Sequence, residues 1–112
     1  RAAQLKRNDL ALASARRLIA MNPWRADYHH LAALVLTEDR AWSAVIDACR
    51  ASIRLNADDV EIRLLLVQAL VRTGDMQAAR AEFEIVLRHD PSRADAHRRW
   101  FARLGAVSPP VR

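Results

Sequence analysis

Apolar residues recur every three or four positions along most of the chain, which is the spacing that places side chains on one face of an α-helix. Leu66, Val67 and Leu70 follow this spacing in one segment, and Ala79 and Phe83 follow it in another. The chain contains only two glycines and four prolines, and this scarcity of turn formers disfavours hairpin-rich β structure. The pattern therefore predicts an all-α fold of helices joined by short links.

About seven helical segments are expected from the polar and proline-containing interruptions of this pattern. They span about residues 1–7, 10–22, 26–38, 41–55, 59–72, 76–89 and 92–104. Residues 105–112 open with Gly105 and contain the pair Pro109 and Pro110. We expect a helix stop and a flexible tail there, because these residue types end helices.

The boundary signals recur at intervals of 34 residues. Pro23, Ala57 and Pro91 stand at equivalent positions, each directly after a polar Asn or Asp. An acidic residue then opens each following helix, at Asp27, Glu61 and Asp95. Proline just past a helix cannot continue it, and an acid in the first turn suits the positive end of the helix dipole. The recurrence predicts consecutive copies of one helical unit.

Apolar positions inside the units match at the same interval. The matched sets are Ala32, Leu66 and Trp100; Ala33, Val67 and Phe101; Leu36, Leu70 and Leu104; Val45 and Ala79; Cys49 and Phe83; and Ile53 and Leu87. Small and large residues alternate in these sets, as two closely packed antiparallel helices require. We expect these positions to form the core.

The stretch from Leu66 to Pro91 resembles the tetratricopeptide repeat consensus. It carries a Gly74-Asp75 turn, a small residue at Ala79, an aromatic residue at Phe83 and the closing proline. The resemblance implies an α-solenoid, a right-handed superhelix of antiparallel helix hairpins. It divides the chain into a partial N-terminal hairpin (1–25), two repeats (26–59 and 60–93), a closing helix (94–104) and a tail (105–112).

Two parts of the chain fit the consensus less well. The unit from Ala26 to Asp59 has Arg40-Ala41 in place of the usual Gly-Asp pair. In the N-terminal hairpin, a turn is expected at residues 8–10, two residues out of register with the later repeats. We also expect apolar surface at this end of the stack, covered by missing sequence or by self-association. On the closing helix, Trp100, Phe101 and Leu104 are expected to face inward, and His97, Arg98, Arg99 and Arg103 to face outward.

The resemblance also implies a function, which is to bind a protein or peptide partner in a concave groove lined by the first helix of each hairpin. The implied lining residues are Asp27, His30, Leu34, Glu38, Glu61, Leu64, Gln68, Val71, Asp95, Arg98 and Ala102. Acids and apolar residues alternate in this set, which favours a peptide with basic and apolar side chains. In the alternative, the acids only cap helices and the groove is empty.

One specialised activity of the family is not expected. Some members clamp a C-terminal carboxylate with lysines and asparagines on these helix faces. Here the same faces carry His30, Leu34, Leu64 and Gln68, with Arg98 as the lone cation.

The formal net charge of +5 raises the alternative of an accessory nucleic-acid-contacting domain. The arginines expected on the convex face are Arg16, Arg17, Arg50, Arg54 and Arg80. Lys6 is the only lysine, however, a skew that often reflects a GC-rich bacterial genome, and acids interrupt the scattered arginines. Protein binding is therefore the favoured interpretation, and nucleic acid is the disfavoured one.

Candidate chemistry is sparse, so neither an enzyme, a metal site nor a cofactor is expected. His29 and His30 are adjacent and point about 100° apart on a helix, so they cannot easily share an ion. His29, Arg63 and His97 occupy equivalent repeat positions and are expected to form a polar ladder. No Gly-x-Ser-x-Gly, Gly-rich phosphate loop or His-Glu-x-x-His motif is present.

The remaining signals concern single residues and the compartment. Cys49 is the only cysteine and is expected to be a buried hydrophobe. Trp42 and Trp100 are expected in the core, whereas Trp24 is expected in an exposed turn and is the better contact candidate. Apolar runs such as Leu64 to Val67 are too short to cross a bilayer. No signal peptide is visible, and a cytoplasmic location is slightly favoured. Since the chain starts at Arg1, we expect it to be a fragment.

Overall fold

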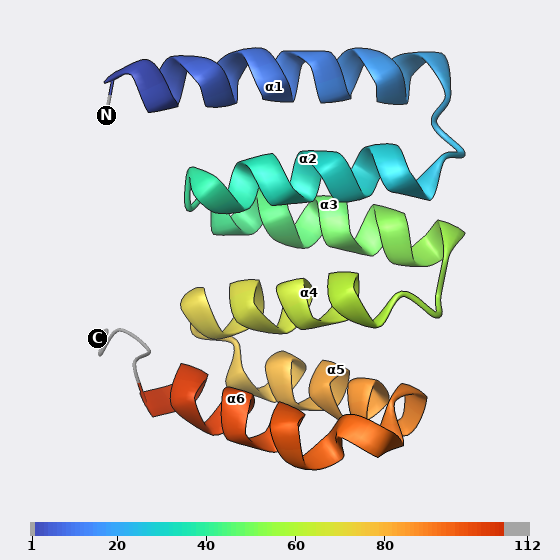
Figure 1. Cartoon of the computed structure of the whole chain (residues 1–112), viewed down its shortest axis with the longest axis vertical. Helices are drawn as coiled ribbons and strands as arrows, with labels where there is room; N and C mark the ends of the chain where they lie inside the picture. The colour runs from blue at the N-terminus through green and yellow to red at the C-terminus, as the bar shows by residue number, and fades with distance from the viewer. Residues whose placement is uncertain (1, 107–112) are drawn as a thin grey trace.

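The computed structural model describes residues 2–106 as a stack of α-helices without strands in that range (Figure 1). The elements are α1 (Ala2–Met21), α2 (Ala26–Glu38), α3 (Trp42–Leu55), α4 (Val60–Arg72), α5 (Met76–His89), the 3-10 turn η1 (Pro91–Arg93) and α6 (Ala94–Ala106). Contacts join consecutive helices from α1 to α5, and α6 also contacts α4. The predicted all-α stack of antiparallel helices is confirmed. No helix among the described residues is long and apolar enough to cross a membrane.

The N-terminal region differs from its prediction. Residues 2–21 form one continuous helix, so the expected turn at residues 8–10 and the partial hairpin over 1–25 are wrong. No glycine or proline interrupts residues 1–22, and adding a residue to an existing helix is far easier than starting a new one. Asn8 is 4% exposed, and its side-chain amide donates to Asp39 Oδ1 at 2.6 Å. Its polar side chain therefore anchors α1 to the end of α2 rather than forming a turn.

The C-terminal helix also departs from its expected bounds. A 3-10 turn precedes it, and α6 continues through Gly105 to Ala106. The predicted helix stop at Gly105 is therefore wrong, while the tail expected for residues 107–112 lies outside the described residues. Along α6, His97 is 9% exposed, so its expected outward position is wrong as well.

The core is continuous through the stack and is centred on α4. Fully buried side chains include Val45 from α3, Ile62 and Val67 from α4, and Val86 from α5. The equivalence of apolar positions predicted from the repeat agrees with this core, to which the following residues belong: Ala33, Leu36, Val45, Cys49, Leu66, Val67, Leu70, Ala79, Phe83 and Leu104. Each helix therefore hides its apolar face only by packing against its neighbours.

Two aromatic side chains and one cysteine complete this core. Phe83 of α5 and Phe101 of α6 stack with ring centroids 4.4 Å apart, which attaches the last helix to the stack. Cys49 is fully buried, as predicted, and burial raises the pKa of its thiol to about 12. Its thiol therefore stays protonated and acts as a small apolar side chain.

Each hairpin turn closes through one residue with a left-handed backbone. Arg40 ends α2 with a φ of 57°, and Gly74 ends α4 with a φ of 88°. In both turns the N–H of the following residue donates to a carbonyl five residues earlier. Ala41 donates to Leu36 at 3.0 Å, and Asp75 donates to Leu70 at 2.9 Å. This is the Schellman arrangement, in which glycine is favoured because it has no Cβ. Arg40 therefore holds a strained conformation that glycine adopts freely.

Equivalent residues of α2, α4 and α6 secure the turn that precedes each of these helices. His29, Arg63 and His97 each place a side-chain nitrogen 2.8–3.0 Å from an oxygen in that turn. The accepting groups are, in order, the carbonyls of Pro23 and Ala57 and the carboxylate of Asp90. The expected polar ladder is wrong, because no hydrogen bond or ion pair joins these three described residues to one another.

Arg63 is the most buried of the charged side chains in these turns. Its side chain is 9% exposed, and Nη1 donates to Glu82 of α5, whose side chain is 14% exposed. Its Nε and Nη2 both donate to the carbonyl oxygen of Ala57. A buried guanidinium is tolerated only when it is neutralised in this way.

Replacing Arg40 by glycine is expected to stabilise the protein by about 0.5–1 kcal/mol, because the left-handed backbone is strained with any Cβ. The reciprocal change, Gly74→Arg, is expected to destabilise by about 1 kcal/mol. A Cβ at Gly74 would meet no atom within 4 Å, so backbone strain alone sets the effect. Urea unfolding followed by circular dichroism measures both, and equal stability of the three proteins would contradict the strain at Arg40.

Replacing Glu82 by alanine is expected to destabilise the fold by about 3 kcal/mol, because it leaves the buried Arg63 charge without its partner. Glu84→Ala provides a matched control on the same helix. The Glu84 side chain is exposed, so its loss is expected to change the free energy of unfolding by less than about 0.5 kcal/mol. Urea denaturation compares the free energies of unfolding of the two variants. Equal losses would show that the Arg63–Glu82 ion pair does not stabilise the fold.

Candidate functional site

A groove of about 370 Å³ runs across three helices that follow one another down the stack in Figure 1, namely α2, α4 and α6. We call it the central groove. Its lining residues are His30, Leu34, Glu61, Leu64, Leu65, Gln68, Ala96, His97 and Trp100. The first helices of the two expected repeats and the expected closing helix therefore supply its whole lining. Five of the residues singled out from the sequence lie in it: His30, Leu34, Glu61, Leu64 and Gln68.

The floor of the central groove is apolar and reachable by solvent. Leu34 is 47% exposed although it lies between helices, and Leu64 and Leu65 are half-buried. Trp100 packs partly against the core and also lines the groove. The sequence predicted this tryptophan in the core, and in the structure its side chain contacts the core and lines the groove as well. An apolar side chain docked here would be shielded from water on several sides.

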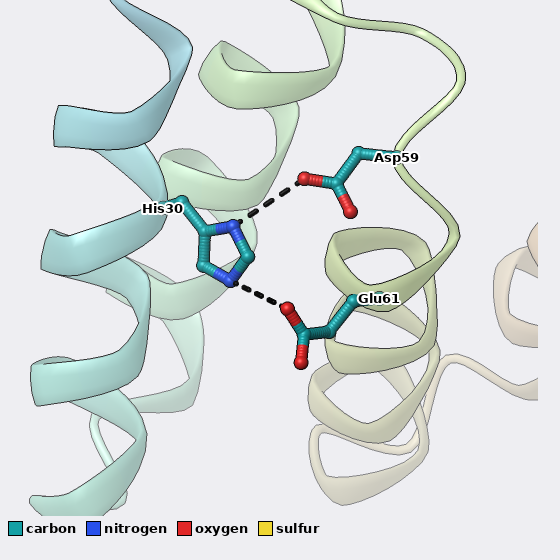
Figure 2. A group of neighbouring side chains, drawn as sticks. All are labelled: His30, Asp59 and Glu61. Carbon is teal, nitrogen blue, oxygen red and sulfur yellow. Dashed lines mark ion pairs between the residues drawn. The ribbon is translucent and has the colours of Figure 1, made fainter.

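One end of the central groove carries an imidazole between two carboxylates (Figure 2). His30 Nδ1 lies 3.3 Å from Asp59 Oδ2, and His30 Nε2 lies 3.3 Å from Glu61 Oε1. Asp59 also caps α4, because its Oδ1 accepts from the Ile62 N–H at 3.2 Å. We call these three residues the acidic end. The groove residues expected from the sequence did not include Asp59, and nothing in its spacing indicated that a histidine 29 residues earlier would meet it.

The acidic end also has the composition of a partial metal site. Ligand atoms of His30, Asp59 and Glu61 lie within 4.8 Å of one another, and imidazole and carboxylate are common ligands of divalent ions. Both carboxylates already pair with the imidazole, however, and Glu61 has an 80% exposed side chain. A protonated imidazole can donate to both carboxylates, so the geometry also fits a polar cluster without an ion.

Several residues expected in the groove lie elsewhere. Asp27 is exposed and pairs with Arg25 at 2.8 Å, and this hydrogen bond holds the pKa of Asp27 below its ordinary value. Glu38 is exposed at the end of α2 and does not line the groove. Val71 is fully buried, so its expected contact with a ligand is wrong.

The reason for the error at Val71 is helix geometry. The groove-facing residues of α4 are Glu61, Leu64, Leu65 and Gln68, and the next position on this face is Arg72. Val71 lies one position before Arg72, about 100° away around the helix, and it falls on the face that packs into the core rather than on the open face. The sequence analysis therefore missed Arg72 and chose the residue before it.

The closing helix presents a different face from the one expected. Ala96, His97 and Trp100 face the groove, whereas Asp95 and Arg98 pair with each other at 3.4 Å on the exposed side. Ala102 is exposed too and lies outside the lining. A 3-10 turn with about three residues per turn precedes α6 but not α2 or α4. The groove-lining positions of α6 are not the repeat equivalents of those in α4, although His97 keeps the turn contact that His29 and Arg63 make. His97 also lowers the pKa of Asp90 through its hydrogen bond.

Beyond Gln68, the hollow continues to the other end of the three helices. A cavity of about 520 Å³ is lined by Thr37, Arg40, Trp42, Gln68 and Arg72. A smaller one of about 270 Å³ is lined by Gln68, Arg72, Trp100, Arg103 and Leu104. None of the three arginines among them was expected in the site. The sequence did contain a signal for them, because Arg72 and Arg103 lie in the last turns of helices whose first turns carry Glu61 and Asp95.

The opposite pole of the stack exposes large apolar side chains, as expected. Leu10 is 63% exposed, Met21 65% and Trp24 66%. Leu10 and Met21 are 11 residues apart on α1, a spacing of about three turns, and so share one face. This face and Trp24 form what we call the α1 apolar face.

Comparison with protein families matches residues 36–98 to the tetratricopeptide repeat, which is more than half of the chain. No curated protein and no solved structure gives a significant match. The matched segment covers α3, α4 and α5 together with the ends of their neighbours, including both Schellman turns and most of the core. The chain belongs to the tetratricopeptide repeat family.

Proposed function

We propose that the central groove binds a peptide segment of a partner protein that carries apolar and basic side chains. Family membership implies a protein–protein interaction module, and the site within it is our own assignment. The observation that carries it is the exposed apolar floor formed by α2, α4 and α6, with Leu34 half-exposed between helices. The proposed role is binding without catalysis.

The apolar floor supplies the affinity in this proposal. Fully burying a leucine side chain contributes about 1.5–3 kcal/mol, so covering the half-exposed Leu34 contributes about 1 kcal/mol. Leu64, Leu65 and Trp100 extend the same surface. Apolar anchors enclosed by a polar rim are the usual energetic centre of an interface.

The acidic end supplies the charge preference. Glu61 is largely exposed beside His30 and Asp59, so its carboxylate can meet a lysine or arginine of the guest. Such a contact at the rim contributes modest affinity and sets the register of the bound segment. The proposed guest therefore places a basic side chain beside its apolar residues.

The nucleic-acid alternative rests on arginines outside the groove. Arg16, Arg17, Arg50, Arg54 and Arg80 are all exposed, on α1, α3 and α5. They are spread over three helices, and none of them lines the central groove or the two cavities beyond it. Exposed arginines alone indicate charge rather than a site, so peptide binding remains the preferred function.

Combining Leu64→Ala with Glu61→Arg is expected to weaken peptide binding at least tenfold, about 1.4 kcal/mol, because it removes an anchor and reverses a rim charge. The ligand would be a 12-residue peptide enriched from a random library on the wild-type protein, and fluorescence anisotropy would measure it. Leu10→Ala with Glu84→Arg makes the same chemical changes outside the groove and is expected to leave affinity unchanged.

If the groove variant and this control variant bind the peptide with equal affinity, the central groove is not the peptide-binding site. The same proteins can be titrated with duplex and single-stranded DNA at rising salt. Binding that persists near physiological salt and is lost in Arg50→Gln with Arg54→Gln would favour the nucleic-acid alternative instead.

We also propose that the α1 apolar face packs against a second copy of the chain, because it exposes Leu10, Met21 and Trp24. Light scattering across concentration is expected to show a dimer for the wild type. Leu10→Ser with Met21→Ser should shift the protein towards monomer without loss of helicity. A wild type that stays monomeric at millimolar concentration would rule the proposal out.

A further inference from the structure

Three arginines converge at the end of the groove opposite to its acidic end. Arg40 lies in the turn after α2, Arg72 is the last residue of α4, and Arg103 lies in the last turns of α6. Arg72 lines both cavities there, which makes the two continuous. Gln68 lines these cavities and the central groove alike, so one surface runs from Glu61 to Arg72. We call the three arginines the basic subsite.

The charges of the basic subsite are uncompensated within the described part of the chain. None of its guanidinium groups has a carboxylate within ion-pair distance there. Arg72 Nε is enclosed by protein and has no hydrogen-bond partner, although enclosed polar atoms are nearly always bonded. Arg63 on the same helix shows the contrast, because Glu82 and the Ala57 carbonyl satisfy it. The subsite therefore presents cationic groups that lack an ion-pair partner among the described residues.

Helix dipoles explain only part of this arrangement. A cation near a helix C-terminus is favourable, which accounts for Arg72 and Arg103. It does not account for the unsatisfied Arg72 Nε, nor for arginine at position 40, where the left-handed backbone favours glycine. A ligand carboxylate that accepts from the solvent-reachable guanidinium nitrogens accounts for the arginine at position 40 and for the clustering of three unpaired cations. Carboxylates fit best, because they match the planar fork of arginine.

We propose that the basic subsite binds an acidic side chain, Asp or Glu, of the same peptide whose apolar residues occupy the central groove. The inference rests on the proposed function and deepens it, since it adds a second charge requirement to the guest. The faces that build the terminal-carboxylate clamp in other family members carry different residues here, so this site is a separate one. Opposite charges at the two ends of the groove then fix the direction in which the guest lies.

The length of the groove sets the spacing of the guest's charges. Glu61 and Arg72 are 11 residues apart on α4, which corresponds to about 16 Å at 1.5 Å per residue. An extended peptide advances about 3.3 Å per residue. The basic and acidic residues of an extended guest are therefore about five positions apart, with the apolar residues between them.

Library selection and a double-mutant cycle test this inference. Twelve-residue peptides enriched on the wild-type protein are expected to carry an Asp or Glu about five positions from a Lys or Arg. Changing that acid to its amide should weaken binding to the wild type about tenfold, and much less to Arg72→Gln or Arg103→Gln. Arg80→Gln removes an exposed arginine from α5 and should retain the full tenfold effect.

The outcomes separate this inference from the proposed function. Two results would refute the basic subsite and leave the proposed groove intact. In the first, the enriched peptides depend on Leu64 for binding but lack acids. In the second, the acid-to-amide change weakens binding equally in Arg72→Gln and the wild type. If enriched peptides bind independently of Leu64 and Glu61, the groove itself fails and the subsite fails with it. Arg103→Gln keeps the test valid should Arg72→Gln disturb folding, because Arg103 is exposed.

Discussion

The structure depends on the burial of apolar faces that no single helical hairpin can hide alone. α4 shows this constraint most clearly, because Ile62, Val67 and Val71 are fully buried and contact helices on both sides. Repeat proteins are stabilised by such nearest-neighbour interfaces rather than by one central core. The same constraint leaves one edge of α4 open, since packing against α3 and α5 covers only part of the helix. That open edge carries Glu61 at one end and Arg72 at the other.

The turns keep this stack in register. His29, Arg63 and His97 each tie their helix to the preceding turn, and the two Schellman turns set the angle between the helices of a pair. Rigid placement of α2, α4 and α6 matters for recognition, because a pre-formed groove orders little on binding. Buried charge contributes to this rigidity only where it is fully paired, as it is for Arg63 with Glu82.

Charge is distributed along the groove rather than over the whole surface. The net charge of +5 suggested a general affinity for polyanions, but the spatial arrangement is more selective. Carboxylates gather near the helix starts at Asp59 and Glu61, and guanidinium groups gather near the helix ends at Arg72 and Arg103. Both placements suit the helix dipoles, so the groove gains its polarity with little electrostatic strain. A guest of matching polarity would be held in one direction.

The sequence by itself determined the repeat, the core and the central part of the groove. Apolar spacing and the 34-residue interval predicted Val67, Ala79 and Phe83 as core, because periodicity reports which face of a helix must be buried. Local sequence could not determine how helices rotate against one another. Val71 is fully buried, whereas its neighbour Arg72 lines the end of the groove. On α6, His97 and Trp100 line the groove in place of Asp95 and Arg98. The contact of Asn8 with Asp39 accompanies an unbroken α1. The meeting of His30 with Asp59 and Glu61 also needed the tertiary structure, since these residues are distant in sequence and only the stacking of the helices brings their side chains together.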